Sequence, residues 1–279
     1  MNKKILLVVI TTLLLLISYA QKSTINYGDN AKAGKYASIR GIKMYYEIYG
    51  TGKPLLIIHG NGGSIKDFAL QIPYFSQQYK VILADSRSHG KSVDTGEVLN
   101  YEMMADDLNA LLNYLQLDSC LVIGWSDGGI NGLLLAMHYP AKVKKLAFTG
   151  ANLRPDTTAV EPSLHRWLAH SVDSLSRETP TPEVKHQYKL WSMMTKEPNI
   201  SLEQLKKVKC PTLVIGGDHD ALLPAHTLQI ASAITQSYLW IVPNSGHAPL
   251  VRYSKLFNET VNTFFKQPYR VIEGLDRLN

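Results

Sequence analysis

Three side chains of this protein belong to the types that carry out nucleophilic catalysis together: Ser126, Asp220 and His247. A serine hydroxyl is a weak nucleophile, so it needs a base to take its proton and a carboxylate to orient that base. Ser126 stands in the sequence Gly-Trp-Ser-Asp-Gly, where an apolar run ends and a helical pattern begins. A serine at such a turn has its hydroxyl pushed outward, and the residues two positions away must be very small. The spacing therefore predicts that Ser126 is a nucleophile at the N-terminus of a helix.

The base and the carboxylate follow later in the chain, each after an apolar run. A predicted strand at residues 211–217 ends in Asp218-His219-Asp220, and His247 follows the last predicted strand. The order serine, acid, histidine is found where the three groups meet at the carboxyl edge of a parallel sheet. Either Asp218 or Asp220 could orient the histidine, and the residues alone do not choose between them. His219, which lies between the two carboxylates, is predicted to be structural.

Acyl transfer also needs two backbone N–H groups that stabilise an oxyanion. The glycine-rich segment at residues 59–63, His-Gly-Asn-Gly-Gly, follows a predicted strand, and its glycines allow the backbone to approach a substrate closely. We predict that the N–H groups of Asn61 and Asp127 form the oxyanion hole. A phosphate cradle is the alternative for such a segment, but neither Gly-Lys-Ser/Thr nor Gly-x-Gly-x-x-Gly is present. No metal or organic cofactor is therefore expected.

Strand and helix patterns alternate along the chain after a first hairpin. Continuous apolar runs predict buried strands, and amphipathic runs with a helical period predict helices. The alternation predicts an α/β fold with a mostly parallel, doubly wound sheet that has helices on both faces. The expected strands span residues 36–40, 42–49, 54–58, 80–84, 120–124, 143–149, 211–216 and 238–242, and the expected helices between and after them span 101–115, 129–138 and 253–265.

Residues 151–205 interrupt this alternation, because they contain two helical patterns and no strand pattern. The segment is predicted to be a helical lid within a single domain at residues 35–279. A lid of this kind covers the site, so we expect Trp191 in the lid, together with Trp125 and Asp127 beside the serine, to contact the substrate. Simple packing in a helix core is the alternative for Trp191.

The N-terminus has the pattern of a secretory signal peptide. Lys3 and Lys4 precede a short apolar run, and Ser-Tyr-Ala at residues 18–20 offers small residues for cleavage. We therefore predict a signal peptide at residues 1–20, a flexible polar segment at 21–34 and export of the mature protein to the periplasm or the extracellular space. An uncleaved membrane anchor is the alternative.

The charge of the chain argues against a nucleic-acid-binding protein, and the positions of its two cysteines argue against a disulfide. The formal net charge is +6 and falls to +4 without Lys3 and Lys4, and the basic residues are scattered, so no nucleic-acid footprint is present. Cys120 and Cys210 each lie at the start of a predicted strand. If one more strand lies between these two, the cysteines are about 10 Å apart, beyond the reach of a disulfide. Both are predicted to be reduced and buried.

Taken together, these segments resemble the α/β-hydrolase family along nearly the whole mature chain. In that family the acid lies in Gly-x-x-Asp followed by x-x-x-Pro, so the resemblance selects Asp220, which Pro224 follows, over Asp218. It implies the α/β-hydrolase fold and a triad of Ser126, His247 and Asp220 that works through an acyl-enzyme. The matching segments are His59-Gly-Asn-Gly-Gly63, Asp85-Ser-Arg-Ser-His-Gly-Lys-Ser92, Gly124-Trp-Ser-Asp-Gly-Gly129, Gly217-Asp-His-Asp220 and Gly246-His247.

Within the family, the segment around the serine followed by Thr-Gly-Ala-Asn at residues 149–152 is similar to the valacyclovir hydrolase branch, also called biphenyl hydrolase-like. This resemblance implies cleavage of α-amino acyl esters, with the carboxylate of Asp127 receiving the ammonium group of the substrate. The alternative for Asp127 is a residue that only complements the helix dipole.

The sequence therefore predicts an exported serine hydrolase that cleaves small carboxylic esters. Its expected partner is a small-molecule ester, with no nucleic acid and no stable membrane anchor after cleavage. Dehalogenases and epoxide hydrolases of this fold use an aspartate nucleophile, so Ser126 argues against both. Carbon–carbon bond hydrolases, aminopeptidases and perhydrolases keep the serine and are alternatives. A ligand-binding protein with a vestigial triad is the non-enzymatic alternative, because a fold alone does not establish a function.

Overall fold

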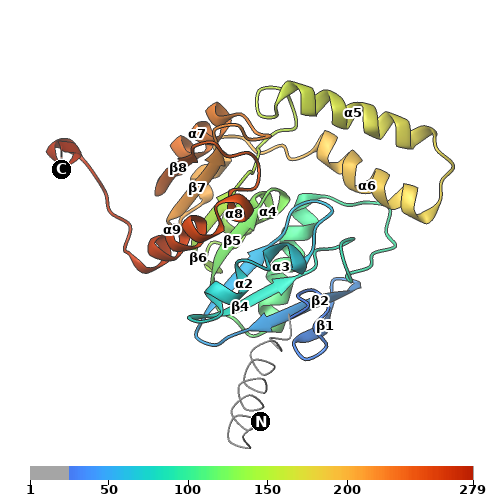
Figure 1. Ribbon diagram of the computed structural model, residues 1–279, viewed down its shortest axis with the longest axis horizontal. Helices are drawn as coiled ribbons and strands as arrows, with labels where there is room; N and C mark the ends of the chain where they lie inside the picture. Colours follow the sequence, from blue (N-terminus) through green and yellow to red (C-terminus); the bar gives the residue numbers. More distant parts are fainter. Residues whose placement is uncertain (1–24, 279) are drawn as a thin grey trace, which may run out of the picture.

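An eight-stranded sheet forms the centre of the protein, and the computed structural model describes residues 25–278 (Figure 1). The strands are β1 (Gly34–Ile39), β2 (Ile42–Tyr49), β3 (Lys53–Ile58), β4 (Tyr79–Ala84), β5 (Cys120–Trp125), β6 (Val143–Thr149), β7 (Thr212–Gly217) and β8 (Ser237–Val242). They lie side by side in the order β1-β2-β4-β3-β5-β6-β7-β8. β2 pairs antiparallel with β1 and β4, whereas all other neighbours are parallel. The predicted fold class is confirmed.

Helices cover both faces of the sheet. The α-helices are α2 (Ile72–Phe75), α3 (Tyr101–Tyr114), α4 (Asp127–His138), α5 (Pro162–Arg177), α6 (Pro182–Lys196), α7 (Pro224–Ala233), α8 (Pro249–Arg252) and α9 (Ser254–Lys266), and the 3-10 helices are η1 (Ile65–Phe68), η2 (Gln204–Lys207) and η3 (Gly274–Leu278). In β3, Leu56 packs in a core with α3 and α4, whereas the next residue, Ile57, packs in a second core with α2 and α9. Both faces of the central strands are buried, which explains their continuous apolar runs.

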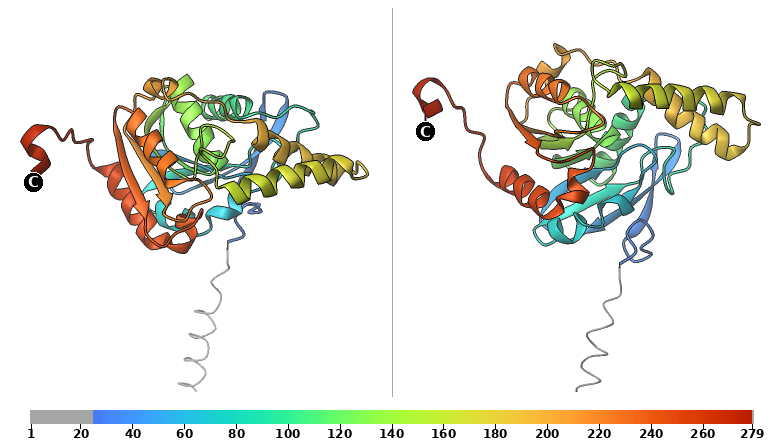
Figure 2. Two further views of the ribbon diagram at one scale, coloured as in Figure 1. Left: turned by 90° about the horizontal axis from the view of Figure 1, so that it is seen from above. Right: turned by 45° about the horizontal axis from the view of Figure 1, so that its top comes forward.

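Helices α5 and α6 form a hairpin between β6 and β7 that extends past the end of the sheet (Figures 1 and 2). This is the segment expected to be a lid. Helix α5 has no buried residue, whereas α6 buries Leu190 and Met193 against the body of the protein. Of the two helices, α6 is therefore the one held in place by core packing.

The polar segment at residues 21–34, which we predict to be flexible, is described by the structure from residue 25 onward. In its described part, the backbone N–H groups of Gly28 and Asn30 donate to the carboxylate of Glu47 at 2.9 and 3.0 Å. Glu47 is fully buried in β2, and a buried carboxylate needs such donors. Residues 25–33 are therefore attached to the sheet by this carboxylate.

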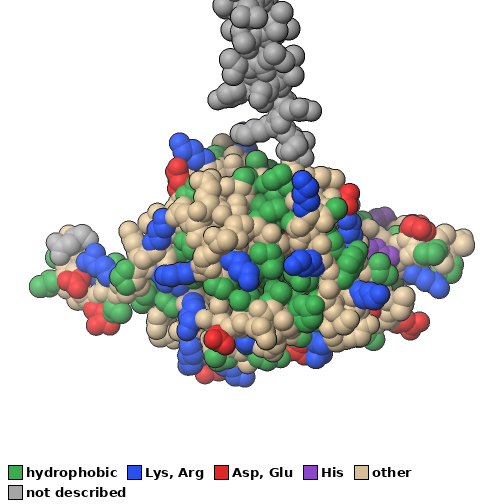
Figure 3. All heavy atoms as spheres, turned by 90° about the horizontal axis from the view of Figure 1, so that it is seen from below, with side chains coloured by type: hydrophobic (Ala, Val, Ile, Leu, Met, Phe, Trp, Pro, Cys, Tyr) green, Lys and Arg blue, Asp and Glu red, His purple; other side chains and the backbone are tan. Residues whose placement is uncertain are grey.

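The predicted signal peptide at residues 1–20 lies outside the described residues. Across residues 25–278, none of the helices combines the length and the apolar character that a bilayer span requires. Cys120 and Cys210 are both free and buried. Cys120 begins β5 and Cys210 precedes β7, and β6 lies between these two strands, as predicted. On the face shown in Figure 3, Lys and Arg side chains stand apart, separated by apolar and neutral groups. This face carries no continuous basic patch.

Candidate active site

Ser126 lies on the sharp turn between β5 and α4. Its φ of 56° is uncommon for a residue with a side chain. The turn is also crowded: a Cβ on Gly124 would lie 2.3 Å from the carbonyl oxygen of Gly128, and a Cβ on Gly128 would lie 2.0 Å from that of Ile58. Close backbone approach therefore requires glycine at both positions, as the sequence pattern indicated. The turn holds the serine at the carboxyl edge of the sheet.

His247 lies between Ser126 and Asp220. Its Nε2 is 3.0 Å from Ser126 Oγ, and its Nδ1 is 2.6 Å from Asp220 Oδ1. Because an ionised carboxylate can only accept hydrogen bonds, Nδ1 carries the proton and Nε2 accepts from the serine hydroxyl. The indole N–H of Trp125 donates to the carbonyl oxygen of His247 at 2.9 Å and fixes the loop that carries the histidine. The structure thus brings the three predicted residues together in a chain of hydrogen bonds.

The choice of Asp220 over Asp218 agrees with this geometry. The side chain of Asp220 is fully buried, and its carboxylate also accepts the N–H groups of Gly217 and Leu222, each at 3.2 Å. Asp218 instead pairs with His219, whose side chain is exposed. Asp218 and His219 therefore stabilise the turn and take no part in the hydrogen-bonded chain.

The two N–H groups predicted to form an oxyanion hole have no acceptor within residues 25–278. Asp127 is the first residue of α4, where backbone N–H groups have no partner within the helix. Asn61 follows Gly60, and a Cβ on Gly60 would lie only 3.0 Å from the Cβ of Ser126. The glycine-rich loop therefore reaches the nucleophile, and both N–H groups are available to an oxyanion.

The side chain of Asp127 is a buried carboxylate next to the nucleophile. It is 3% exposed, and it accepts hydrogen bonds from the amide Nδ2 of Asn61 at 3.0 Å and from the hydroxyl of Tyr101. Burial raises the pKa of Asp127 to about 6, although the two hydrogen bonds act in the opposite direction. No Lys, Arg or His within the described part of the chain forms an ion pair with it. Its charge is thus met by neutral donors alone.

A cavity of about 460 Å³ contains Ser126, His247 and Asp127 and is closed on one side by the lid. The lid contributes an apolar wall in which the rings of Trp167 and Trp191 lie 5.2 Å apart. The polar lining is acidic: three carboxylates line the cavity, and no Lys or Arg does. They belong to Asp67, Asp127 and Glu197. A larger, more open hollow of about 650 Å³ lies against β1 and β2 and contains none of the predicted site residues.

The sequence predicted some of the cavity lining and missed other parts. Trp125, Asp127 and Trp191 line the cavity, as expected of substrate-contacting residues. Tyr101 and Glu197 also line it, and no sequence pattern indicated this. Tyr101 begins a helix on the body of the protein and Glu197 follows the last lid helix, so only their packing reveals that they meet.

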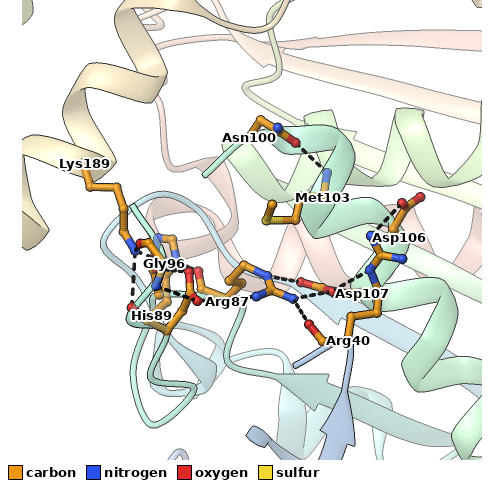
Figure 4. Close-up of polar contacts among 11 residues, drawn as sticks. Arg40, Arg87, His89, Gly96, Asn100, Met103, Asp106, Asp107 and Lys189 are labelled. Carbon is orange, nitrogen blue, oxygen red and sulfur yellow. Dashed lines mark hydrogen bonds and ion pairs between the residues drawn. The ribbon is translucent and has the colours of Figure 1, made fainter. Parts of the chain in front are cut away.

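A network of ion pairs holds the lid helix α6 to the loop between β4 and α3 (Figure 4). Lys189 of α6 binds Asp94 at 3.3 Å and the carbonyl oxygen of Gly96 at 2.8 Å. Asp94 also meets Arg87, which makes a bidentate pair with the buried Asp107 of α3 at 2.7 and 2.8 Å. The position of α6, and with it the cavity wall, is therefore fixed from the body of the protein.

No metal centre is found in the part of the chain that the structure describes, because no group of three or more His, Cys, Asp or Glu side chains is placed to hold an ion. The polar groups of the cavity include those of the serine and His247, the three carboxylates, and the side chains of Asn61, Tyr101, Asn152, His165 and Thr195.

The architecture matches a large set of solved structures. A thermophilic esterase from Thermogutta terrifontis superposes with a TM-score of 0.72, at 24% identity over 85% of this chain and 100% of the esterase. Residues 53–173, which include the nucleophile turn, match the family described as alpha/beta hydrolase fold. The chain has the α/β-hydrolase fold. The resemblance recognised from the motifs is thereby confirmed.

Proteins similar to this chain in sequence are named as hydrolases. The chain is 27% identical over 261 residues to serine hydrolase BPHL of Mus musculus, covering 86% of this chain and 88% of the relative. The Homo sapiens protein of the same name is 26% identical over the same length. The branch of the family suggested by the serine motif is thus represented among its relatives.

Proposed function

We propose that this α/β hydrolase cleaves small carboxylic esters by a serine mechanism. Ser126 Oγ attacks the carbonyl carbon while His247 takes the hydroxyl proton, and the N–H groups of Asn61 and Asp127 stabilise the oxyanion. When the tetrahedral intermediate collapses, the alcohol leaves with the proton from His247. A water molecule then attacks the acyl-enzyme with the same base, which releases the carboxylic acid and restores the serine.

One observation supports this proposal above all others: the hydrogen-bonded chain from Ser126 through His247 to Asp220 opens into a cavity. Such a chain in the protein interior would be a costly arrangement for packing alone, whereas it gives a serine the base that it needs. The names of the relatives, serine hydrolase and esterase, agree with it.

Substitution of the nucleophile tests the proposal. We expect Ser126→Ala to lower the turnover of p-nitrophenyl acetate by at least about 10³-fold, because the triad acts as a unit. Ser232→Ala, at an exposed serine on α7, serves as the control and keeps full activity. Equal turnover by the wild type and Ser126→Ala would refute the serine mechanism. Ligand binding without turnover in the wild type would instead favour a binding protein with a vestigial triad.

A second candidate function is hydrolysis of α-amino acyl esters, and Asp127 is the observation that favours it. Its carboxylate lines the cavity beside the nucleophile without a cationic partner within the described residues. A buried carboxylate is costly unless a cation or several donors meet it, and a substrate ammonium group would supply the missing charge. Rates on matched p-nitrophenyl esters with plain and α-amino acyl groups test this function.

We also propose that the mature protein is exported, as the first residues predict, and that its partners are small-molecule esters. Expression in a bacterial host, followed by N-terminal sequencing of the protein from the periplasm and medium, tests the export. A new N-terminus at Gln21 supports cleavage after residue 20. Recovery of the uncleaved chain in the membrane fraction would support the membrane anchor instead.

A further inference from the structure

Glu197 is a second carboxylate in the cavity, directly after the end of lid helix α6. Its Oε2 accepts a hydrogen bond from the backbone N–H of Tyr101 at 3.1 Å, and its side chain lines the same cavity as Ser126. Within residues 25–278 it forms no ion pair with a Lys, Arg or His. Like Asp127, it therefore presents a charge that only neutral groups meet.

Tyr101 connects the two carboxylates. Its hydroxyl is hydrogen-bonded to Asp127, and its backbone N–H donates to Glu197. Tyr101 is 2% exposed, and burial together with the charge of Asp127 keeps its pKa well above the ordinary value, so the phenol stays a neutral donor. Both carboxylates thus contact the same tyrosine residue.

The surroundings of this pair favour a ligand with two cationic groups joined by an aliphatic chain. No Lys or Arg lines the cavity, and its two histidines, His165 and His247, form no ion pair with either carboxylate. The lid wall offers Trp191 and Met194, which suit a chain of methylene groups, and Trp167, whose ring face also attracts cations. Basic α-amino acids have this shape, because four or five carbons, counting Cα, separate the α-ammonium group from the side-chain cation.

We propose that Glu197 is a specificity-determining residue that binds the side-chain cation of lysyl, ornithyl or arginyl esters while Asp127 binds the α-ammonium group. This rests on the proposed function in its α-amino acyl form. It narrows the substrate class from α-amino acyl esters in general to those of basic amino acids. The structural alternative is that Glu197 only ties the end of α6 to the N-terminus of α3, where a carboxylate complements the helix dipole.

The test compares the ethyl esters of lysine and norleucine, because norleucine is nearly isosteric with lysine but lacks its side-chain cation. The full chain is assayed for release of the free amino acid, and the ratio of kcat/KM for the two esters is measured. We expect the wild type to favour lysine about tenfold, the effect of one charge-assisted hydrogen bond in a partly buried site. In Glu197→Gln, which keeps an acceptor for the N–H of Tyr101, the ratio falls to near one because lysyl hydrolysis slows.

Glu203→Gln is the matched control, since Glu203 is an exposed carboxylate that pairs with Lys206 outside the cavity. It should keep the wild-type ratio. A ratio near one in the wild type, or an unchanged ratio in Glu197→Gln, overturns the proposal. An equal fall for both esters in Glu197→Gln assigns the residue to holding the lid and also overturns it. Failure of the wild type to hydrolyse p-nitrophenyl acetate would count against the proposed function itself.

Discussion

We expect the proposed preference for α-amino acyl esters to depend on pH through the carboxylate of Asp127. With a pKa of about 6, about nine tenths of this carboxylate is ionised at pH 7 and about one tenth at pH 5. The α-amino group of the substrate, with an ordinary pKa of about 7.7 to 8, stays protonated over this range. The charge attraction is thus present above the pKa of Asp127 and is lost as the pH falls through it. We expect the preference for α-amino over plain acyl groups to fall about tenfold between pH 7 and pH 5, because it follows the ionised fraction.

The measurement is the ratio of kcat/KM for two p-nitrophenyl esters that differ only in an α-amino group. A ratio is the right quantity because any loss of active or folded protein affects both esters equally. Asp127→Asn is the control, since an amide keeps the size of the side chain and an acceptor for the hydroxyl of Tyr101. Its ratio should be low and independent of pH.

Two results would refute this reasoning. A wild-type ratio that stays constant from pH 5 to pH 7 would mean that the ionisation of Asp127 does not control the preference for the α-ammonium group. A ratio in Asp127→Asn that still falls as the pH is lowered would show that another group binds the ammonium group of the substrate. In either case the carboxylate would be assigned to the alternative role, at the N-terminus of α4, where it complements the helix dipole.

The ion-pair network leads to two further predictions. Asp107→Asn should lower the free energy of unfolding by about 3 to 5 kcal/mol in urea denaturation, because Arg87 stays buried without its bidentate partner. The control is Asp106→Asn at the partly exposed neighbour, which should lower the free energy of unfolding by at most about 1 kcal/mol. Equal losses in the two variants would contradict the role of burial. Lys189→Met should raise KM for large esters by about three- to tenfold and leave KM for p-nitrophenyl acetate unchanged, because Lys189 holds α6 and its cavity wall through Asp94. Steady-state kinetics in which the variant has the wild-type KM for the large ester as well would contradict this.

Most of the elements could be predicted because their causes are local. Strand β6 spans Val143–Thr149 as expected, and α3 spans Tyr101–Tyr114, one residue shorter than its pattern. The contacts of the polar segment near the N-terminus could not be predicted in this way. The buried carboxylate of Glu47 holds the described part of this segment, and a sequence pattern does not show which distant group a polar segment meets.

The sequence by itself determined the position of the turn that carries Ser126. A serine between Gly124 and Gly128 requires a strand-to-helix turn, because only glycine fits the close approach of the backbone there. It also determined the order of serine, acid and histidine, which specifies where a parallel sheet brings them together. The choice of Asp220 over Asp218 needed either the family pattern or the coordinates, since both carboxylates lie in one turn.

Only the tertiary structure decided what surrounds that serine. Tyr101 and Glu197 are 96 residues apart in the chain and meet because α6 packs against the body of the protein. The side-chain amide of Asn61 donates to Asp127, 66 residues away in the chain, because the folded sheet brings the two segments together. Periodicity and turn chemistry act over a few residues, whereas the acidic wall of the cavity results from contacts between elements that are distant in sequence. The type of chemistry is therefore readable from local sequence, and the shape and charge of the cavity that receives the substrate depend on the packing of the lid.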